Sequence, residues 1–429
     1  MYTKKIFLLI TLLCTMLFTV QSQVITQPIT QPITLEECQR KAVMHYPAIA
    51  RFSVIERTRN FSLSNANRAY WPHFSLEAQA TWQSDVTKVP IEIAALEIPE
   101  LDREQYRVTA SVNQIIWDGG QRTAQKGTID ATAEMERRQL ETEIYSLRER
   151  VNNLFFGVLL INEQLAIQSM LEEELQRNNE KVQSYIDNGI ANEADLSAVI
   201  VEQLRVGQGR IEKEAVREAY MKMLSLLIGE TIDIQTTFVK PSVESNGSSP
   251  VINRPELTFF DAQESFLETQ KGLLSARNRP VIGAFAQGGY GKPALDMFEN
   301  RLRPYFLGGV RFSWNFGNLY TYDNEKKKIE LQKKTLDSQR ETFLFNLNLQ
   351  IPQQQTEIEK FSRTMRDDDE IIRLRTLIRK AAEAKVENGT MTVSDMLEEV
   401  TSEEAAREAK VLHEIQYLLS VYNLKYTTN

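Results

Sequence analysis

The stretch FSLEAQATW, residues 74–82, alternates apolar and polar residues along its whole length. Phe74, Leu76 and Trp82 occupy apolar positions, and Ser75 occupies a polar one. Successive side chains of a β-strand point to opposite faces of the sheet. A period of two therefore predicts a strand with one apolar and one polar face.

Three further stretches carry this alternation. YRVTASVN (106–113) is as regular as the first, and its alternation slips near Gln114, which is typical of a β-bulge. IGAFAQGGY (282–290) and FLGGVRFSW (306–314) are glycine-rich versions of the same pattern. We therefore expect four strands of about nine residues each, the length that a transmembrane β-strand requires.

The positions of the aromatic residues favour membrane strands over a soluble four-stranded sheet with one buried face. All four tryptophans fall within or at the ends of the expected strands, and tyrosines accompany them. Aromatic side chains collect at both membrane interfaces of transmembrane barrels. The expected interface residues are Trp71, Trp82, Trp117, Trp314, Tyr290 and Tyr305.

Four strands cannot close a membrane barrel, because the smallest such barrels have eight strands and an open sheet edge is excluded from lipid. The chain must therefore assemble with copies of itself. Two copies would give eight strands, whose interior is filled by side chains, whereas three would give twelve strands and leave room for a lumen. A conduit therefore favours a trimer with a twelve-stranded barrel.

Long helices are expected in the first half of the chain. The tract 121–187 lacks proline, which breaks helix interiors, and its apolar residues recur at helical spacing. Asn188 and Gly189 follow it, and these residue types commonly end helices. A return helix is expected over about 192–228.

The second half carries the same arrangement. A helix is expected over 321–386, with a kink at Pro352. Asn388 and Gly389 would end it, and a return helix is expected from residue 393 to about residue 422. Helices of this length with repeating apolar stripes are typical of coiled coils.

The landmarks of the two halves indicate an internal duplication. NGIANEAD (188–195) and NGTMTVSD (388–395) share Asn-Gly, five residues and then Asp, at an offset of 200. Two other landmarks recur in the same order, with offsets of 197 and 208 residues. These are IIWDGG (115–120) with FSWNFG (312–317), and the proline-bounded segments 47–72 and 255–280. A recurring order of elements predicts two structural repeats.

The N-terminus has the layout of an export signal. Lys4 and Lys5 precede an apolar core over 6–20, and a cleavage site is expected before Gln23. The apolar core is too short for a comfortable membrane-spanning helix. The expected divisions are a signal peptide (1–22), a first repeat (23–242), a polar linker (243–253) and a second repeat (254–429).

Composition argues against several other classes of protein. The chain carries a net charge of −8, a poor match to the basic face of a nucleic-acid-binding protein. Without the signal it keeps only Cys38, so no internal disulfide is expected. His45, His73 and His413 show no metal-ligand spacing, and no phosphate-binding loop is present. We expect no enzyme activity, cofactor or metal.

The longest apolar run after residue 22 has eight residues (154–161), so no membrane helix is expected.

Taken in order, several motifs resemble those of one family. They are TLEECQRKAVMHYPAI (34–49), SVNQIIWDGG (111–120), RPEL (254–257) and the paired NG…D turns. With these, the whole mature chain is similar to the TolC-type outer-membrane efflux proteins, the exit ducts of tripartite pumps. The resemblance implies an internally duplicated α+β membrane protein, a homotrimer whose twelve-stranded barrel continues as an α-helical coiled-coil barrel through the periplasm.

The resemblance also implies partners and site residues. A periplasmic adaptor (a membrane fusion protein) and an inner-membrane transporter would be the partners, at the outer membrane of a Gram-negative bacterium. Three acids would narrow the periplasmic entrance, and three copies would form rings that select cations. Alternatively, they are ordinary acids near a helix start, where the helix dipole favours them. The implied docking tips are Asn188, Gly189, Asn388 and Gly389, and the implied gate acids are Asp195, Asp395 and Glu398.

One position departs from the family pattern. Met391 stands where well-known members have a basic residue just after the tip, so a salt bridge that closes the entrance is not implied here. The predicted function is an outer-membrane duct that passes substrates from periplasm to exterior. The alternatives are the duct of a protein-secretion system and, in a different class, a periplasmic coiled-coil scaffold without a pore.

Overall fold

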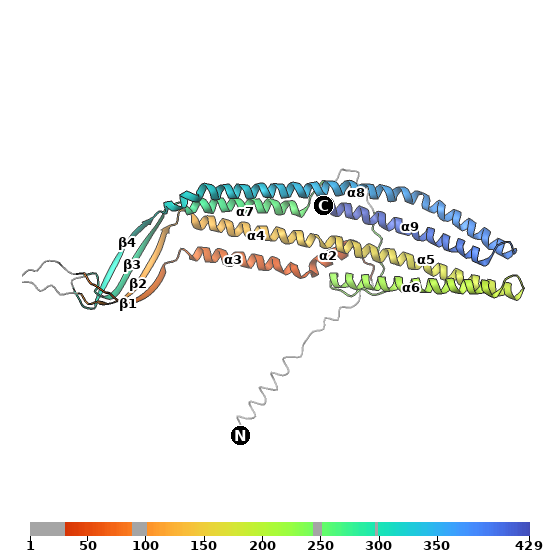
Figure 1. Cartoon of the computed structure of the whole chain (residues 1–429), viewed down its shortest axis with the longest axis horizontal. Coiled ribbons are helices and arrows are strands. Elements are labelled where there is room, and N and C mark those ends of the chain that lie inside the picture. The colour runs from red at the N-terminus through yellow and green to blue at the C-terminus, as the bar shows by residue number, and fades with distance from the viewer. Residues whose placement is uncertain (1–30, 88–100, 243–250, 297–298) are drawn as a thin grey trace, which may run out of the picture. The chain divides into compact units, whose positions relative to one another are not determined.

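A computed structural model describes residues 31–87, 101–242, 251–296 and 299–429 (Figure 1). The expected signal peptide and most of the expected linker lie outside these residues. The chain forms two compact units, and each takes segments from both halves of the sequence. The sheet unit comprises the described residues of Ala48–Tyr145, Val251–Gln350 and Thr428–Asn429. The hairpin unit comprises the described residues of Met1–Pro47, Ser146–Pro250 and Ile351–Thr427.

Both halves of the chain show the same succession of elements: a helix, two strands, a long helical segment, a turn and a return helix. In the first half these are α3 (Arg51–Arg68), β1 (His73–Trp82), β2 (Glu104–Trp117), α4 (Gln121–Tyr145), α5 (Leu147–Asp187) and α6 (Glu193–Ile228). In the second half they are α7 (Pro255–Arg277), β3 (Val281–Lys292), β4 (Arg303–Ser313), α8 (Leu319–Glu387) and α9 (Val393–Thr428).

An additional helix, α2 (Leu35–His45), was not expected from the sequence. The Thr34 side chain caps it by accepting a hydrogen bond from the Glu37 backbone N–H. A parallel bridge between Ile33 and Phe238 precedes it and ties this segment to the chain that follows α6. Short 3₁₀ segments lie at Pro47–Ala50 and Phe316–Asn318.

The four strands form one antiparallel sheet in the order β1-β2-β3-β4. Their register brings apolar positions of neighbouring strands into line. One such row crosses all four strands and consists of Leu76, Ala110, Gly288 and Phe306. The four strands predicted from the alternation are confirmed. The register of β2 and β3 shifts just before Trp117, close to the predicted bulge.

The helices of the sheet unit lie side by side in the order α3, α4, α7 and the first part of α8 (Figure 1). An ion pair of 2.7 Å between Arg59 and Asp130 joins α3 to α4. Another, of 3.0 Å, between Arg340 and Asp261 joins α7 to α8. In this order α3 and α8 are the outer helices, as β1 and β4 are the edge strands.

The hairpin unit packs α5 and α6 with the second part of α8 and with α9 around two apolar cores. The first core also includes α2 and is built on Phe155, Phe156 and Val158 of α5, which have almost no exposed surface. The second core lies toward the turns and combines the four helices. Its members are Leu171, Leu175, Val182, Val199, Val206, Ala382, Val386, Val393, Met396, Leu397 and Val400.

Two expectations about the helices need correction. The predicted helix 121–187 is divided at Ser146, where α4 ends and α5 begins. The return helix α9 extends to Thr428 rather than to residue 422. Helix α8 continues through Pro352, and the kink expected there stays a prediction.

The expectation that no helix could span a membrane was also too strict. Within Gln121–Asp187 one stretch is long and apolar enough to do so by length and composition alone. Half of that stretch is buried inside the protein, and Phe155 and Val158 belong to the first core. Packing in the hairpin unit therefore accounts for its apolar character.

Candidate channel surfaces

The two hairpin tips have the same backbone conformation. Gly189 and Gly389 adopt φ angles of +72° and +67°, in the left-handed region that favours glycine. The expectation that Asn-Gly ends both long helices is confirmed. A Cβ atom at either position would meet nothing within 4 Å, so only backbone strain restricts substitution there.

Hydrogen bonds repeat from one tip to the other. Asn188 Nδ2 donates to the carbonyl oxygen of Ser184, and Asn388 Nδ2 donates to that of Ala384, both at 2.7 Å. One residue beyond each glycine, a backbone N–H bonds the carbonyl five residues earlier, as in a Schellman motif. The shared Asn-Gly thus ends both helices by the same means.

The acids of the repeated pattern cap the return helices. Asn192 and Asp195 form a capping box, in which Asp195 accepts from the Asn192 backbone N–H at 3.0 Å. In the second tip, Thr392 Oγ1 donates to Asp395 at 2.7 Å and accepts from the Asp395 N–H at 3.2 Å. Each aspartate therefore stabilises a helix start, which explains its fixed distance from Asn-Gly.

The other residues singled out near the second tip differ in environment. Glu398 is exposed on α9, one turn after Asp395. Met391 packs against the second core of the hairpin unit. An apolar side chain at 391 therefore contributes to the packing of the tip.

The sheet presents an apolar face that no described element covers. On this face Leu76 of β1 is 75% exposed and Phe306 of β4 is 72% exposed. Val108 of β2 and Val310 of β4 are also exposed. A soluble sheet would bury such a face against a core, and a continuous exposed apolar patch marks contact with a membrane or a protein. The soluble-sheet alternative is therefore disfavoured.

Aromatic residues lie at both ends of the sheet. Trp71, Trp117 and Trp314 are at the end where the strands meet the helices, whereas Trp82 and Tyr290 are near the other end. Tyr106 also belongs to this second group, although it is not among the interface residues expected from the sequence. From Tyr106 to Trp117 the strand covers about 36 Å at ~3.3 Å per residue, or a height of about 26 Å at a tilt of ~45°. That height matches the ~25 Å apolar band of membrane barrels.

The opposite face of the sheet is rich in hydroxyl groups. Ser75 and Ser111 share a hydrogen bond of 2.6 Å across β1 and β2. The hydroxyl of Tyr305 is bonded to Thr109 Oγ1, so Tyr305 lies on this polar face rather than with the apolar residues. Its ring covers Gly289 of β3, where a Cβ atom would lie 3.0 Å from the ring.

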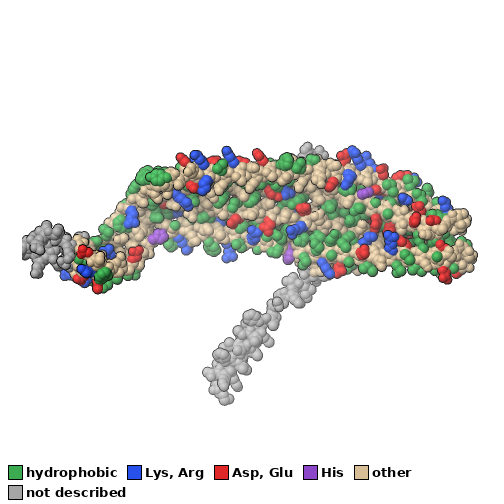
Figure 2. Space-filling model, in the orientation of Figure 1, with side chains coloured by type: hydrophobic (Ala, Val, Ile, Leu, Met, Phe, Trp, Pro, Cys, Tyr) green, Lys and Arg blue, Asp and Glu red, His purple; other side chains and the backbone are tan. Residues whose placement is uncertain are grey.

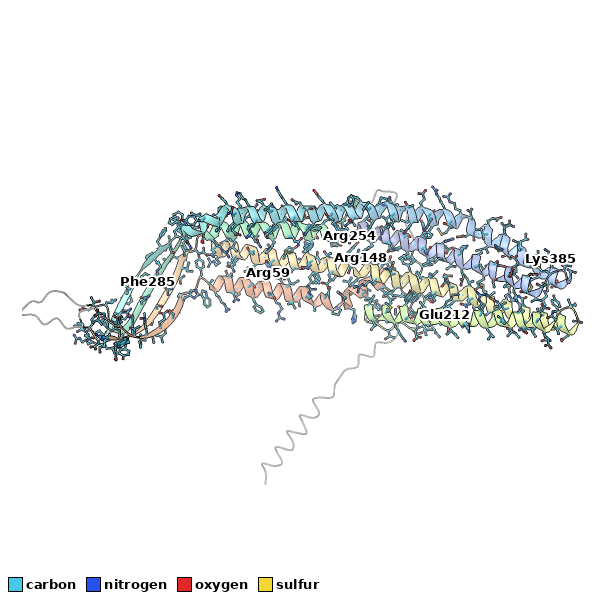
Figure 3. All side chains as sticks on the ribbon, viewed as in Figure 1. Arg59, Arg148, Glu212, Arg254, Phe285 and Lys385 are labelled. Carbon is cyan, nitrogen blue, oxygen red and sulfur yellow. The ribbon has the colours of Figure 1, made fainter. Side chains whose placement is uncertain are left out.

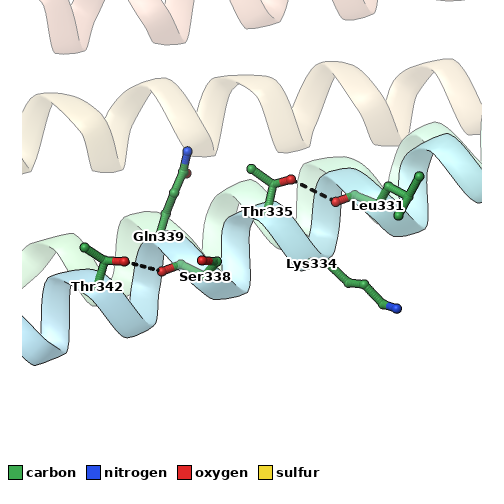
Figure 4. Close-up of a pocket in the computed structure, with 6 residues that line it drawn as sticks. All are labelled: Leu331, Lys334, Thr335, Ser338, Gln339 and Thr342. Atoms are coloured by element: carbon green, nitrogen blue, oxygen red, sulfur yellow. Dashed lines mark hydrogen bonds between the residues drawn. The ribbon is translucent and has the colours of Figure 1, made fainter.

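The outer helices of the sheet unit carry exposed apolar seams. On α8 an open groove of about 540 Å³ runs along the helix surface between Leu331 and Thr342 (Figure 4). Alternating steps of four and three residues extend this line to Phe345 and Leu349, and its apolar members are at least 60% exposed. Such spacing is the a/d pattern of coiled coils. On α3, Phe61 and Val54 lie seven residues apart and are both exposed. Figure 2 shows hydrophobic side chains among charged ones over the visible face of the helices.

The hairpin unit contains a buried charge cluster that was not predicted from the sequence. Arg379 of α8 is 15% exposed and lies beside Glu174 of α5, Glu383 of α8 and Glu403 of α9. Glu403 is 6% exposed and also accepts hydrogen bonds from Thr376 and Arg407. Although burial raises the pKa of Glu403, these hydrogen bonds lower it overall. The cluster joins three helices through one guanidinium.

The contact between α6 and α9 contains a carboxylate, Glu404, whose pKa is raised rather than lowered. Lys213 of α6 pairs with Glu408 of α9 at 2.8 Å. Burial, and then the charge of Glu408, raise the pKa of nearby Glu404 to about 7. The folded state therefore binds this proton more tightly than the unfolded state. The contact is accordingly most stable at acid pH and weakens as the pH rises through about 7.

Comparison with known proteins addresses the fold. No protein-family model matches the chain, and no curated protein sequence does. Solved structures match over 92% of the chain. The Vibrio cholerae outer membrane protein VceC is 12% identical, with 94% of it covered and a TM-score of 0.67. The Campylobacter jejuni outer membrane channel CmeC is 14% identical, with 85% covered and a TM-score of 0.64. The chain has the fold of TolC-type outer-membrane channels. A structure of the open state of the Neisseria gonorrhoeae channel MtrE, at 11% identity, 88% coverage and a TM-score of 0.65, agrees.

This likeness confirms the resemblance drawn from the sequence motifs at the level of the fold. The structure adds features that those motifs did not identify. They are the exposed seams of α3 and α8, the interface residue Tyr106 and the buried Arg379 cluster. The seam of α8 is readable from spacing alone, since Leu331, Phe345 and Leu349 fit one heptad pattern. The Arg379 cluster gives no such local signal.

Proposed function

We propose that the protein is the outer-membrane exit duct of a tripartite efflux pump, passing substrates from the periplasm to the exterior. The exposed apolar face of the four-stranded sheet, bounded by aromatic residues at both ends, is the observation that carries this proposal. The fold shared with outer-membrane channels supports it. This proposed function does not depend on a metal-binding or cofactor-binding site.

The edges of the sheet support a barrel made from several copies. Among the described strands, β1 and β4 each pair on one side only. Unpaired strand edges are not tolerated in lipid, so the edge of one copy must pair with the edge of another. With four strands per copy, β4 of one copy and β1 of the next would run antiparallel. Three copies give twelve strands, enough to enclose a lumen.

The outer helices support the same ring. The exposed seam of α8 and the exposed residues of α3 lie on opposite outer helices of the sheet unit, as β4 and β1 lie on opposite edges. Contacts between two different surfaces of identical copies close into a ring when the rotation allows it. In the proposed homotrimer, α8 of one copy packs against α3 of the next, and the helices form a tunnel across the periplasm.

We also attribute the two similar halves to an internal duplication, with repeats over 23–242 and 254–429. The succession of elements and the matching hydrogen bonds of the two tips support this proposal. An export signal over 1–22 would direct the chain across the inner membrane. The tips would lie at the periplasmic entrance, where an adaptor joins the duct to an inner-membrane transporter.

The proposed function is tested by purification and planar-bilayer recording. The protein is expected to require detergent, to have the mass of a trimer and to conduct ions. A detergent-free monomer without conductance would contradict the proposal and favour a periplasmic coiled-coil scaffold. The double variant Asp395→Asn with Glu398→Gln should weaken cation preference, because it removes negative charge from the proposed entrance while keeping the size of both side chains.

These substitutions separate charge from helix capping. An asparagine at 395 keeps an oxygen that accepts from Thr392 Oγ1, whereas alanine would also remove the cap. Glu193→Gln is the matched control, since Glu193 is an exposed acid of the same region that is not assigned to the entrance. If the double variant has the selectivity of the wild type, Asp395 serves only as a helix cap and Glu398 is not part of the entrance.

Adaptor docking is tested by the double variant Gly189→Val with Gly389→Val. Valine strongly disfavours the left-handed conformation, at a cost of about 1–2 kcal/mol per tip, and should distort both turns. Because no other atoms surround these positions, outer-membrane trimers should form in normal amounts while transport and crosslinks from the tips to an adaptor are lost. Gly207→Val, in an open position of α6 with a helical conformation, is the control. Normal transport by the double variant would show that the tips do not dock an adaptor.

A further inference from the structure

A cationic and aromatic level crosses the polar face of the sheet near its helix-side end. His73, Asn113, Phe285 and Gly309 are direct cross-strand partners in β1, β2, β3 and β4. Phe285 lies within the sheet (Figure 3). The guanidinium carbon of Arg311, on β4, lies 5.0 Å from the centre of the Phe285 ring. This distance is within the range of a cation–π interaction.

The glycine at 309 sets the position of the aromatic ring. A Cβ atom there would lie 3.2 Å from the Phe285 ring, so the ring rests directly over the glycine backbone. Rings packed over cross-strand glycines are held close to the sheet. Phe285 thereby supplies a fixed support for the Arg311 side chain, which is itself exposed.

Arg311 has no carboxylate partner in the described part of the chain. The four strands contain two acids, Glu77 and Glu104. Glu77 lies four residues along β1 from His73, about 13 Å away at ~3.3 Å per residue. Glu104 is at the far end of β2 and accepts from the Tyr106 hydroxyl at 3.0 Å. Asp118, just after β2, accepts from the backbone N–H groups of Gly120 and Arg122. The positive charge at this level is therefore not neutralised by an ion pair.

We propose that Arg311, supported by Phe285, forms a ring of positive charge that selects anionic, carboxylate-bearing solutes in the barrel. This inference rests on the proposed function, which turns the polar face toward the lumen and brings three copies of Arg311 to one level. The ring would lie where the barrel meets the helices, far along the chain from the acids of the tips.

The chemistry of the guanidinium fits this class of solute. It offers a planar fork of N–H donors that matches a carboxylate with two parallel hydrogen bonds. Salt screens fixed charges beyond a Debye length of ~8 Å, so each guanidinium acts on the ions that pass close to it. Fixed rings of Arg or Lys are a known means of favouring anions in pores.

The test compares ion selectivity of purified trimers in planar bilayers under a KCl gradient. Arg311→Gln should shift the reversal potential toward that of K⁺ and lower the chloride-to-potassium permeability ratio about threefold or more. It should also reduce the relative permeability of benzoate. Arg311→Lys keeps the charge but loses the planar fork, so the chloride-to-potassium permeability ratio should stay close to that of the wild type while benzoate permeability falls.

Arg301→Gln is the matched control. Arg301 lies before β4 and pairs with Glu299, which also pairs with Arg303, so its loss should leave selectivity unchanged. Phe285→Leu provides a second route if Arg311→Gln does not assemble, because it removes the support and should produce a smaller shift in the same direction. Conducting Arg311→Gln channels with wild-type selectivity would overturn the inference and leave the duct intact. A wild-type protein without conductance would instead overturn the proposed function.

Discussion

Replacing both Leu76 and Phe306 with arginine is expected to abolish assembly in the outer membrane. The two residues belong to one cross-strand row near the middle of the apolar face, and both side chains are largely exposed. An arginine on the lipid face of a barrel costs about 2–4 kcal/mol at the bilayer midplane. Six such residues in a trimer would cost about 12–24 kcal/mol on this scale. Membrane fractionation and native mass measurement should show soluble or degraded chains in place of trimers.

The matched control places arginine one position away on the other face. Ser75 and Leu307 belong to the neighbouring row, and Leu307 is as apolar as the residues of the test variant. The double variant Ser75→Arg with Leu307→Arg should therefore still form trimers, because these positions face the proposed lumen. Equal loss of trimers in both double variants would contradict the assignment of faces. Normal trimers in both would favour a protein that does not enter the membrane.

The strands were predictable because their signal is local. Each strand alternates within its own sequence, so Leu76 and Ser75 are assigned to opposite faces without knowledge of the partner strand. The tips were predictable for a similar reason, since the conformation of Gly189 and Gly389 depends on a few neighbouring residues. Helix α2 was not predicted, because residues 34–49 were interpreted only as a family motif.

Interactions between distant segments could not be predicted in this way. The Arg379 cluster depends on how α5, α8 and α9 are placed along one another. Shifting one helix by a single turn of ~5.4 Å would separate these side chains without changing any local pattern. The capping roles of Asp195 and Asp395 lie between these cases. Their distance from Asn-Gly was visible, but the same residues also fitted a charged ring, and the hydrogen bonds were needed to show the cap.

Replacing Arg379 with leucine is expected to destabilise the hairpin unit by about 3–5 kcal/mol, the typical effect of removing one partner from a buried ion pair. The substitution would leave Glu174 and Glu403, both poorly exposed, without their shared cation. Glu174 is already the less stabilised of the two. It pairs with Arg379, whereas Glu403 also pairs with Arg407, and burial raises the pKa of Glu174. Denaturant unfolding followed by helical circular dichroism measures the loss.

The pH dependence identifies the cause. In the wild type, the pKa of Glu403 is lowered, so its stabilisation is present above its usual pKa and is lost as the pH falls through the folded value. In the variant, Glu403 keeps Arg407, but Glu174 loses the cation with which it pairs. Protonation should relieve this unpaired carboxylate, so the difference from the wild type should shrink toward acid pH. The second substitution Glu174→Gln should restore part of the lost stability, since it removes the uncompensated charge. Arg373→Leu is the control on the same helix, because Arg373 pairs with Glu370 in the open and should matter little. If Arg379→Leu is no more destabilising than Arg373→Leu, the cluster does not hold the three helices together.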